Sequence, residues 1–161
     1  MAVEIERKFL IKDTSFKADV VSATRIVQGY LSSVPERTVR VRVKGDKCFL
    51  TIKGIGSASG ASRFEWEREI PKEEALELLE ICEPGVIDKT RYLVPCGKHT
   101  FEVDEFYGEN NGLTVAEVEL SNEGEGFETP TWLGEQVTGQ AKYYNSMLMK
   151  NPYKNWEAVT V

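Results

Sequence analysis

Charged side chains recur at a spacing of two residues through much of the sequence. The acidic pairs are Glu4 with Glu6, Glu65 with Glu67, Glu102 with Asp104, and Glu117 with Glu119. The basic pairs are Arg40 with Arg42 and Lys89 with Arg91, while Lys8 and Lys53 stand singly. Side chains two apart on a β-strand point to the same face of the sheet. Each pair would therefore place one sign of charge on one face of a strand.

The two kinds of side chain suit different ligands. Arginine offers phosphate oxygens a planar fork of donors, and lysine offers a point charge. Carboxylate clusters that lack cysteine and histidine suit hard divalent cations such as Mg2+ or Mn2+. A complex of polyphosphate with a metal ion would satisfy both kinds of side chain, if the strands curl so that their charged faces meet.

The alternative is that every charged face is simply wet. That arrangement is the common one for a single antiparallel strand. Solvated surfaces usually mix charges of both signs, whereas most of these strands carry one sign. The sorting of charge favours an enclosed polar interior. Unpaired buried charge is costly, so such an interior would need a ligand of high charge density.

Apolar residues alternate with the charged ones and predict eight strands. We expect them at residues 3–11, 26–31, 38–44, 47–53, 64–70, 88–94, 99–106 and 113–121. Short turns join most of them, with a tight hairpin at Gly45. The expected fold class is α+β, an eight-stranded antiparallel β-barrel with a few flanking helices. A barrel of about eight strands can hold one small ligand.

Few segments show helical periodicity. Residues 71–82 start with a proline suited to a first helical turn, and they place Ala75, Leu78, Leu79 and Cys82 on one apolar stripe. Shorter helices are expected at 16–22, 131–137 and 142–149. Residues 54–62, rich in glycine and serine, are expected to form a flexible loop.

Composition limits the function class. The 161 residues are expected to form one domain, residues 1–161. A net charge of −6 argues against a general nucleic-acid binder. Three scattered cysteines without a CxxC pair argue against zinc and suit a reducing compartment. Because there is no apolar leader and no apolar run of roughly 20 residues, we expect a cytoplasmic protein with no membrane partner.

In their order along the chain, the charged motifs resemble the CYTH superfamily, the triphosphate tunnel metalloenzymes. Residues 4–8 (EIERK) are similar to its ExExK signature, which is weak evidence when taken alone. The motifs RVR (40–42), TIK (51–53), EWE (65–67), KTRY (89–92), EVD (102–104) and EVE (117–119) follow in the family's order. The resemblance extends over residues 3–149 and implies a tunnel of eight antiparallel strands.

The resemblance also implies roles for individual residues. The implied metal ligands for Mg2+ or Mn2+ are Glu4, Glu6, Glu117 and Glu119. The implied catalytic and phosphate-binding residues are Lys8, Arg40, Arg42, Lys53, Lys89 and Arg91, and Glu119 is counted among the catalytic residues as well. Further acidic lining residues are Glu65, Glu67, Glu102 and Asp104, which either bind metal or position water.

The function implied is a metal-dependent hydrolase that cleaves inorganic triphosphate to pyrophosphate and phosphate. The chain is short, and its sequence shows no added aromatic pocket for a base. An adenylyl cyclase, or a nucleoside or thiamine triphosphatase, would use the same tunnel and is the alternative. A non-catalytic polyphosphate binder is the alternative of another class, although it would gain nothing from so many carboxylates. The expected partner is a small triphosphate, and the resemblance is compatible with a homodimer.

Several residues have a structural interpretation beside a functional one. Gln28 is expected to be structural or a minor lining residue, and Arg63 either binds phosphate or forms a surface salt bridge. Tyr143, Tyr144 and Asn145 either close one mouth of the tunnel or pack. Trp132 is expected to anchor the terminal helix. The single histidine, His99, and the polar loop 122–126 are expected at the surface. Trp156 is expected in a loose C-terminal tail.

Overall fold

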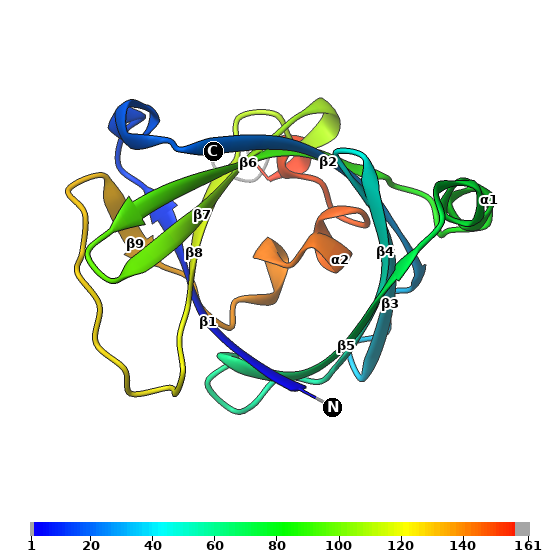
Figure 1. The fold of residues 1–161 in the computed structure, drawn as a ribbon, viewed down its shortest axis with the longest axis horizontal. Coiled ribbons are helices and arrows are strands. Elements are labelled where there is room, and N and C mark those ends of the chain that lie inside the picture. Colours follow the sequence, from blue (N-terminus) through cyan, green and yellow to red (C-terminus); the bar gives the residue numbers. More distant parts are fainter. Residues whose placement is uncertain (1, 157–161) are drawn as a thin grey trace.

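Nine antiparallel strands form a single sheet in this computed structural model, which describes residues 2–156. The strands are β1 (Ala2–Ile11), β2 (Ser22–Ser32), β3 (Arg37–Lys44), β4 (Lys47–Gly54), β5 (Ser62–Ile70), β6 (Ile87–Cys96), β7 (His99–Phe106), β8 (Thr114–Glu119) and β9 (Leu133–Gln136). Eight of them run in the order β5-β4-β3-β2-β6-β7-β8-β1, and pairing of β1 with β5 closes the ring. The expected eight-stranded barrel is confirmed, and Figure 1 looks into it.

The ninth strand, β9, corrects one expectation. Residues 131–137 were expected to be helical, but Leu133–Gln136 instead pair with the end of β1 beyond its contact with β5. Gly134 lies so close to β1 that a Cβ atom there would be 3.0 Å from the carbonyl oxygen of Leu10. The absence of a side chain at Gly134 therefore permits a close backbone approach that a sequence pattern does not reveal.

The helices are few and short, as expected. Helix α1 (Lys72–Glu80) confirms the helix predicted at 71–82. The helix expected at 16–22 is a 3-10 turn, η1 (Ser15–Asp19), because β2 already begins at Ser22. The helix expected at 142–149 is divided into η3 (Ala141–Tyr143) and α2 (Asn145–Leu148) by the extended backbone of Tyr144. The remaining turns are η2 (Gly108–Asn110) and η4 (Tyr153–Asn155). No helix within residues 2–156 is long and apolar enough to cross a membrane.

Apolar clusters lie outside the ring and at one end of its interior. One cluster packs η1 and the segment before β9 onto β1, β7 and β8, and Trp132 belongs to it, with its ring 5.8 Å from Phe16 and 5.5 Å from Phe101. The expectation that Trp132 anchors the terminal helix is therefore wrong. A second cluster lies between α1 and the strands β3 and β4. Because the outward faces of the strands carry these contacts, their inward faces are free to be polar.

The third cluster fills one end of the barrel. Ile87, Phe106 and Val115 each lie two residues from an inward charged residue, and they contact Tyr143 and Leu148 of the C-terminal segment. Figure 1 shows this segment, in orange, within the ring of strands. The charged part of the interior therefore lies beside an apolar plug.

Two surface expectations also change. His99 is half-buried beneath loop 122–126, and its Nε2 lies 2.6 Å from a carboxylate oxygen of Glu125. Trp156 packs edge-on against the rings of Tyr143 and Tyr153, at 5.3 and 5.2 Å between centroids. Trp156 is thus part of the packing around the plug, while residues 157–161 lie outside the described chain. All three cysteines are free, as expected.

Candidate functional site

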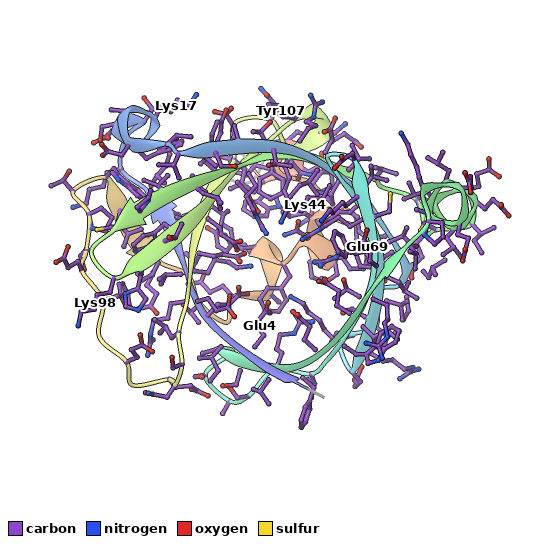
Figure 2. All side chains as sticks on the ribbon, viewed as in Figure 1. Glu4, Lys17, Lys44, Glu69, Lys98 and Tyr107 are labelled. Atoms are coloured by element: carbon purple, nitrogen blue, oxygen red, sulfur yellow. The ribbon has the colours of Figure 1, made fainter. Side chains whose placement is uncertain are left out.

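The inward faces of the strands enclose a cavity of about 250 Å3. Figure 2 shows Glu4 inside the ring of strands, whereas Lys17 and Lys98 lie on its outside. The predicted residues that line the cavity are Glu4, Lys8, Arg40, Arg42, Lys53, Glu65, Glu67, Lys89, Arg91, Glu102, Glu117 and Glu119. Of the predicted set, Glu6 and Asp104 do not line it. Residues that are 115 positions apart in sequence, such as Glu4 and Glu119, therefore share one space, which the wet-face alternative does not predict.

Strands β1 and β8 carry the first group of carboxylates. In their antiparallel register Glu6 lies opposite Glu119, and Lys8 lies opposite Glu117. Lys8 Nζ is 3.3 Å from a carboxylate oxygen of Glu117. Burial, together with the charges of Glu117 and Glu4, raises the pKa of Glu6 well above its usual range. Burial alone would raise the pKa of Glu117, but the attraction of Lys8 outweighs it and holds this pKa well below the usual range of a glutamate.

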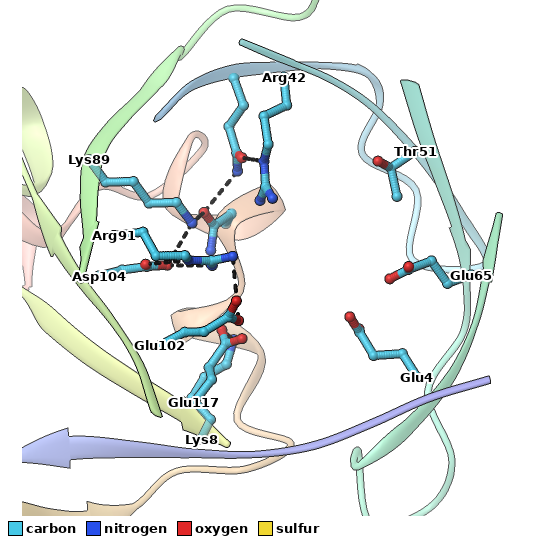
Figure 3. A network of polar contacts seen from close by, with 12 residues as sticks. Glu4, Lys8, Arg42, Thr51, Glu65, Lys89, Arg91, Glu102, Asp104 and Glu117 are labelled. Atoms are coloured by element: carbon cyan, nitrogen blue, oxygen red, sulfur yellow. Dashed lines mark hydrogen bonds and ion pairs between the residues drawn. The ribbon is translucent and has the colours of Figure 1, made fainter. Parts of the chain in front are cut away.

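A second acidic group lies where β1 meets β5. Lys53 Nζ is 2.7 Å from Glu4 and 3.6 Å from Glu65. Burial and the neighbouring Glu4 raise the pKa of Glu65 to about 7. Figure 3 shows Glu4 and Glu65 across the cavity from Arg91 and Lys89. Carboxylates that repel each other in this way would be stabilised by a cation.

The wall opposite is basic and is built on Asp104 of β7. Asp104 is 2% exposed and lies behind the wall, where it accepts a bond of 2.7 Å from Lys89 and two bonds of 2.8 Å from Arg91. Arg91 also lies 3.4 Å from Glu102. Burial, with repulsion from Arg91 and Arg42, lowers the pKa of Lys89 to about 7. Asp104 thus orients two cations and does not itself reach the cavity.

Two arginines of β3 complete the basic wall. Arg40 donates to Thr51 at 3.3 Å and lies 3.9 Å from Glu67, but its buried Nε has no partner among the described residues. Burial, with repulsion from Arg40 and Arg91, lowers the pKa of Arg42 to about 9. A buried donor left without a partner is costly. An anion in the cavity would supply acceptors for these groups.

The sequence assigned only minor roles to the amides Gln28 and Asn145, and it did not connect them with the basic wall. Gln28 is fully buried and accepts a bond from Arg42, and Asn145 begins α2 and lines the cavity. Gln28 was detectable, because it shares the inward face of β2 with Tyr30. Asn145 carried no such signal, since it lies in no strand. Arg63 lines the cavity and forms no ion pair within residues 2–156, which disfavours the surface salt bridge.

The four predicted metal ligands were compared with what a hard cation needs. Glu4, Glu6, Glu117 and Glu119 lie on two adjacent strands, where burial and then repulsion from neighbouring carboxylates raise the pKa of Glu6 and of Glu119. Oxygen donors crowded in this way fit a divalent cation by their chemistry. Within residues 2–156, however, no three acidic, histidine or cysteine side chains already surround one point. Lys8 and Lys53 instead serve as the counter-ions of Glu117 and Glu4.

The sequence and the fold both resemble those of known proteins. Residues 2–150 match the family model described as the CYTH domain. The chain belongs to the CYTH family. An inorganic triphosphatase of Acetivibrio thermocellus is 47% identical to it over 158 residues, which cover 98% of this chain and 99% of that protein.

Two further CYTH comparisons agree. An inorganic triphosphatase of Nitrosomonas europaea is 36% identical over 150 residues, covering 90% of this chain and 95% of that protein. The crystal structure of an inorganic triphosphatase superposes with a TM-score of 0.65 at 32% identity, covering 92% of this chain and 95% of that one. The CYTH resemblance predicted from the motifs is therefore confirmed in both sequence and fold.

Proposed function

We propose that this protein is a divalent-metal-dependent triphosphatase that hydrolyses inorganic triphosphate to pyrophosphate and phosphate. The observation that carries the proposal is the enclosed cavity in which Arg40, Arg42, Lys89 and Arg91 face a group of carboxylates. A compact polyanion carrying a divalent cation complements both walls. The two curated relatives, which are themselves named inorganic triphosphatases, support this choice of substrate.

The basic wall binds and stabilises the phosphate groups. Phosphoryl transfer depends mainly on positioning and on stabilisation of charge. Arg40 and Arg42 donate to phosphate oxygens, and Lys89 and Arg91 hold positive charge beside the leaving pyrophosphate. Lys8 and Lys53 neutralise carboxylates in the free protein and add positive charge around the bound substrate.

The acidic wall would hold the metal and the attacking water. Glu4, Glu6, Glu117 and Glu119 would hold Mg2+ or Mn2+, which when bound draws charge from the phosphate oxygens. We assign the orientation of the water to Glu119, because burial and the charges of Glu4 and Glu102 raise its pKa and make it a better proton acceptor. Asp104 is not suited to this role, because Lys89 and Arg91 occupy both of its oxygens.

The organisation and location of the enzyme stay predictions. We continue to predict one domain over residues 1–161, and the family match to residues 2–150 supports it. A reducing compartment, consistent with three free cysteines, supports a place in the cytoplasm. The homodimer compatible with the family resemblance stays a prediction.

A phosphate-release panel tests the proposal. Inorganic triphosphate, ATP, GTP, thiamine triphosphate and pyrophosphate are each supplied with Mg2+, with Mn2+ and with EDTA. The proposal predicts the highest kcat/KM for inorganic triphosphate, equal amounts of phosphate and pyrophosphate as products, and no turnover in EDTA. Triphosphate left intact with both metals would contradict it.

An organic triphosphate is a second candidate, and a specific observation favours it. A cavity of about 230 Å3 adjoins the first and shares Thr38, Arg63 and Tyr144 with it. Its other walls include Ile55 and Met147, so it is more apolar than the tunnel. The base or thiazole carried through the α-phosphate of such a substrate would fit this space. A higher kcat/KM for ATP or thiamine triphosphate than for triphosphate would favour this candidate, and cyclic AMP among the products of ATP would identify a cyclase.

A further inference from the structure

Unlike most cationic side chains of the tunnel, Arg42 forms no ion pair with a carboxylate of the described residues. Lys8, Lys53 and Arg91 each lie within 3.4 Å of a carboxylate. Arg42 forms no ion pair within residues 2–156, and its only side-chain partner there is the amide of Gln28. Arg42 is nevertheless buried, with 8% of the residue exposed, and it shares the wall with Arg40 and Arg91. No carboxylate within residues 2–156 therefore pairs directly with this charge, and the attraction of Asp104 acts on it without contact.

Two amides hold Arg42 and Lys89 in one continuous network. Arg42 Nε donates to Gln28 Oε1 at 2.8 Å, and Gln28 Nε2 donates to Asn145 Oδ1 at 2.8 Å. The same oxygen of Asn145 accepts a second bond of 2.8 Å from Lys89 Nζ. Figure 3 shows this network above Arg91, with the terminal nitrogens of Arg42 directed into the open space. Strand register fixes it, because Gln28 pairs directly with Arg42.

Neutral partners have a physical consequence here. An amide oxygen orients a cation by one hydrogen bond but leaves its net charge intact, whereas a carboxylate cancels that charge. We propose that Gln28 and Asn145 are positioning residues, which aim Arg42 and Lys89 at the triphosphate through neutral oxygens and so keep the positive charge of Arg42 available to the substrate. This inference rests on the proposed function, because it takes triphosphate as the ligand of the cavity.

The alternative is that both amides only fill space and satisfy buried donors. That role predicts that any disruptive substitution lowers the melting temperature, while the folded fraction binds triphosphate as before. The positioning role predicts a different pattern for an acid at the same place. Gln28→Glu has nearly the same shape and gives Arg42 a counter-ion, so it competes with the substrate for the same charge.

The test compares Gln28→Glu with a matched control in the complete protein. Gln136 also accepts a bond from an arginine, Arg7, at 3.1 Å, but outside the cavity, so Gln136→Glu changes the net charge equally. The Kd for inorganic triphosphate is measured by calorimetry in EDTA, and kcat and KM by phosphate release with saturating metal. The melting temperature of each free protein is measured alongside.

We expect Gln28→Glu to raise the Kd for triphosphate by about tenfold to a hundredfold, the range for one hydrogen bond to a charged group. The melting temperature of the free variant should stay near that of the wild type, because the carboxylate relieves repulsion among the arginines but cannot donate the bond that Gln28 Nε2 gives to Asn145 Oδ1. Gln136→Glu should leave the Kd for triphosphate within about twofold of the wild-type value, since solvent and salt screen an exposed charge outside the cavity. If Gln28→Glu does not fold, Asn145→Asp carries the test, with the same direction expected.

Two results would overturn the inference. One is an unchanged Kd in the folded acid variant, and the other is an equal rise of Kd in Gln136→Glu. The proposed function fails separately: a wild-type protein that binds triphosphate without hydrolysing it contradicts the activity and leaves the binding comparison intact. A wild-type protein that does not bind triphosphate overturns both.

Discussion

Counter-ions divide the charged side chains of the cavity into distinct kinds. Asp104 fixes Lys89 and Arg91 from behind the wall. Lys8 and Lys53 are paired with carboxylates that are themselves predicted to bind metal. Arg40 and Arg42 have weak or neutral partners. Each kind should respond differently to mutation, because removal of a counter-ion affects folding and removal of an unpaired cation affects binding.

The buried carboxylate of Asp104 is the most sensitive to substitution. Asp104→Asn leaves Lys89 and Arg91 buried without their counter-ion, which should lower the free energy of unfolding at pH 7 by about 3–5 kcal/mol. Against the effect of burial, Arg91 and Lys89 depress the pKa of Asp104. Its contribution is therefore present above the ordinary carboxylate pKa of about 4 and is lost as the pH falls below that value. The free energy of unfolding in urea, measured from about pH 2 to about pH 7, should depend less on pH in the variant than in the wild type. An equal pH dependence in the two proteins would refute the assignment.

Arg40 should matter more for activity than for folding. Its Nε is buried without a partner among the described residues, and Glu67, which lies 3.9 Å from Arg40, keeps its bond from Thr51 when Arg40→Ala removes the guanidinium. We expect kcat/KM for triphosphate to fall by about a thousandfold, as for other arginines that act on a transferred phosphoryl group. Phosphate release measures the loss. Arg68→Ala, which removes an exposed arginine over the ring of Trp66, is the control and should retain full activity.

The carboxylates of β1 give a prediction that combines metal and pH. Burial and two like charges raise the pKa of Glu6, so the free protein loses stability as the pH rises from the ordinary carboxylate pKa through the raised one. Glu6→Gln removes this loss, and its melting temperature without metal should exceed that of the wild type at neutral pH. The metal concentration for half-maximal activity should rise by about tenfold or more, as when partners of a metal site are removed. A variant that kept wild-type metal dependence would show that Glu6 is no ligand.

At the scale of elements, the alternation of apolar and charged residues predicted the barrel strands well. It did so because both faces of each strand have a definite environment, one under helices or loops and the other in the cavity. It failed at β9, where the decisive feature is close backbone contact at Gly134. It also gave no indication that Asn145 bonds to Gln28 and Lys89, because the approach of α2 to β2 and β6 depends on the path of the C-terminal segment.

Helix α1 offers a test of the two-faced strand. Gly29 of β2 faces this helix, and a Cβ atom there would lie 3.0 Å from Cβ and Sγ of Cys82. Gly29→Val should therefore overpack the contact and lower the free energy of unfolding by about 1–3 kcal/mol. The kcat/KM of the folded variant should change little, since Gly29 points away from the cavity. Denaturant unfolding and phosphate release measure the two quantities.

Gly54→Ala is the matched control for that substitution, because its Cβ would make an ordinary 3.6 Å contact with Phe64. Its stability should remain within about 1 kcal/mol of the wild type. A large loss of activity in Gly29→Val without loss of stability would contradict the assignment of opposite faces on β2.

At the scale of the whole molecule, closure of the barrel separates the interior charge from the surface. The chain carries a net charge of −6, yet one wall of its cavity is a concentrated basic surface. Net charge alone therefore argued against a general nucleic-acid binder but gave no information on this local field. The order of the motifs along the chain supplied the predicted site, and the register of the strands brought those motifs together.

The most direct test is a crystal structure of the protein with inorganic triphosphate and Mn2+, with anomalous diffraction used to locate the metal. We predict phosphate groups bonded to Arg40 and Arg42, and an anomalous peak within coordination distance of carboxylates among Glu4, Glu6, Glu117 and Glu119. Triphosphate and manganese bound elsewhere on the molecule, without contact to these side chains, would contradict the account.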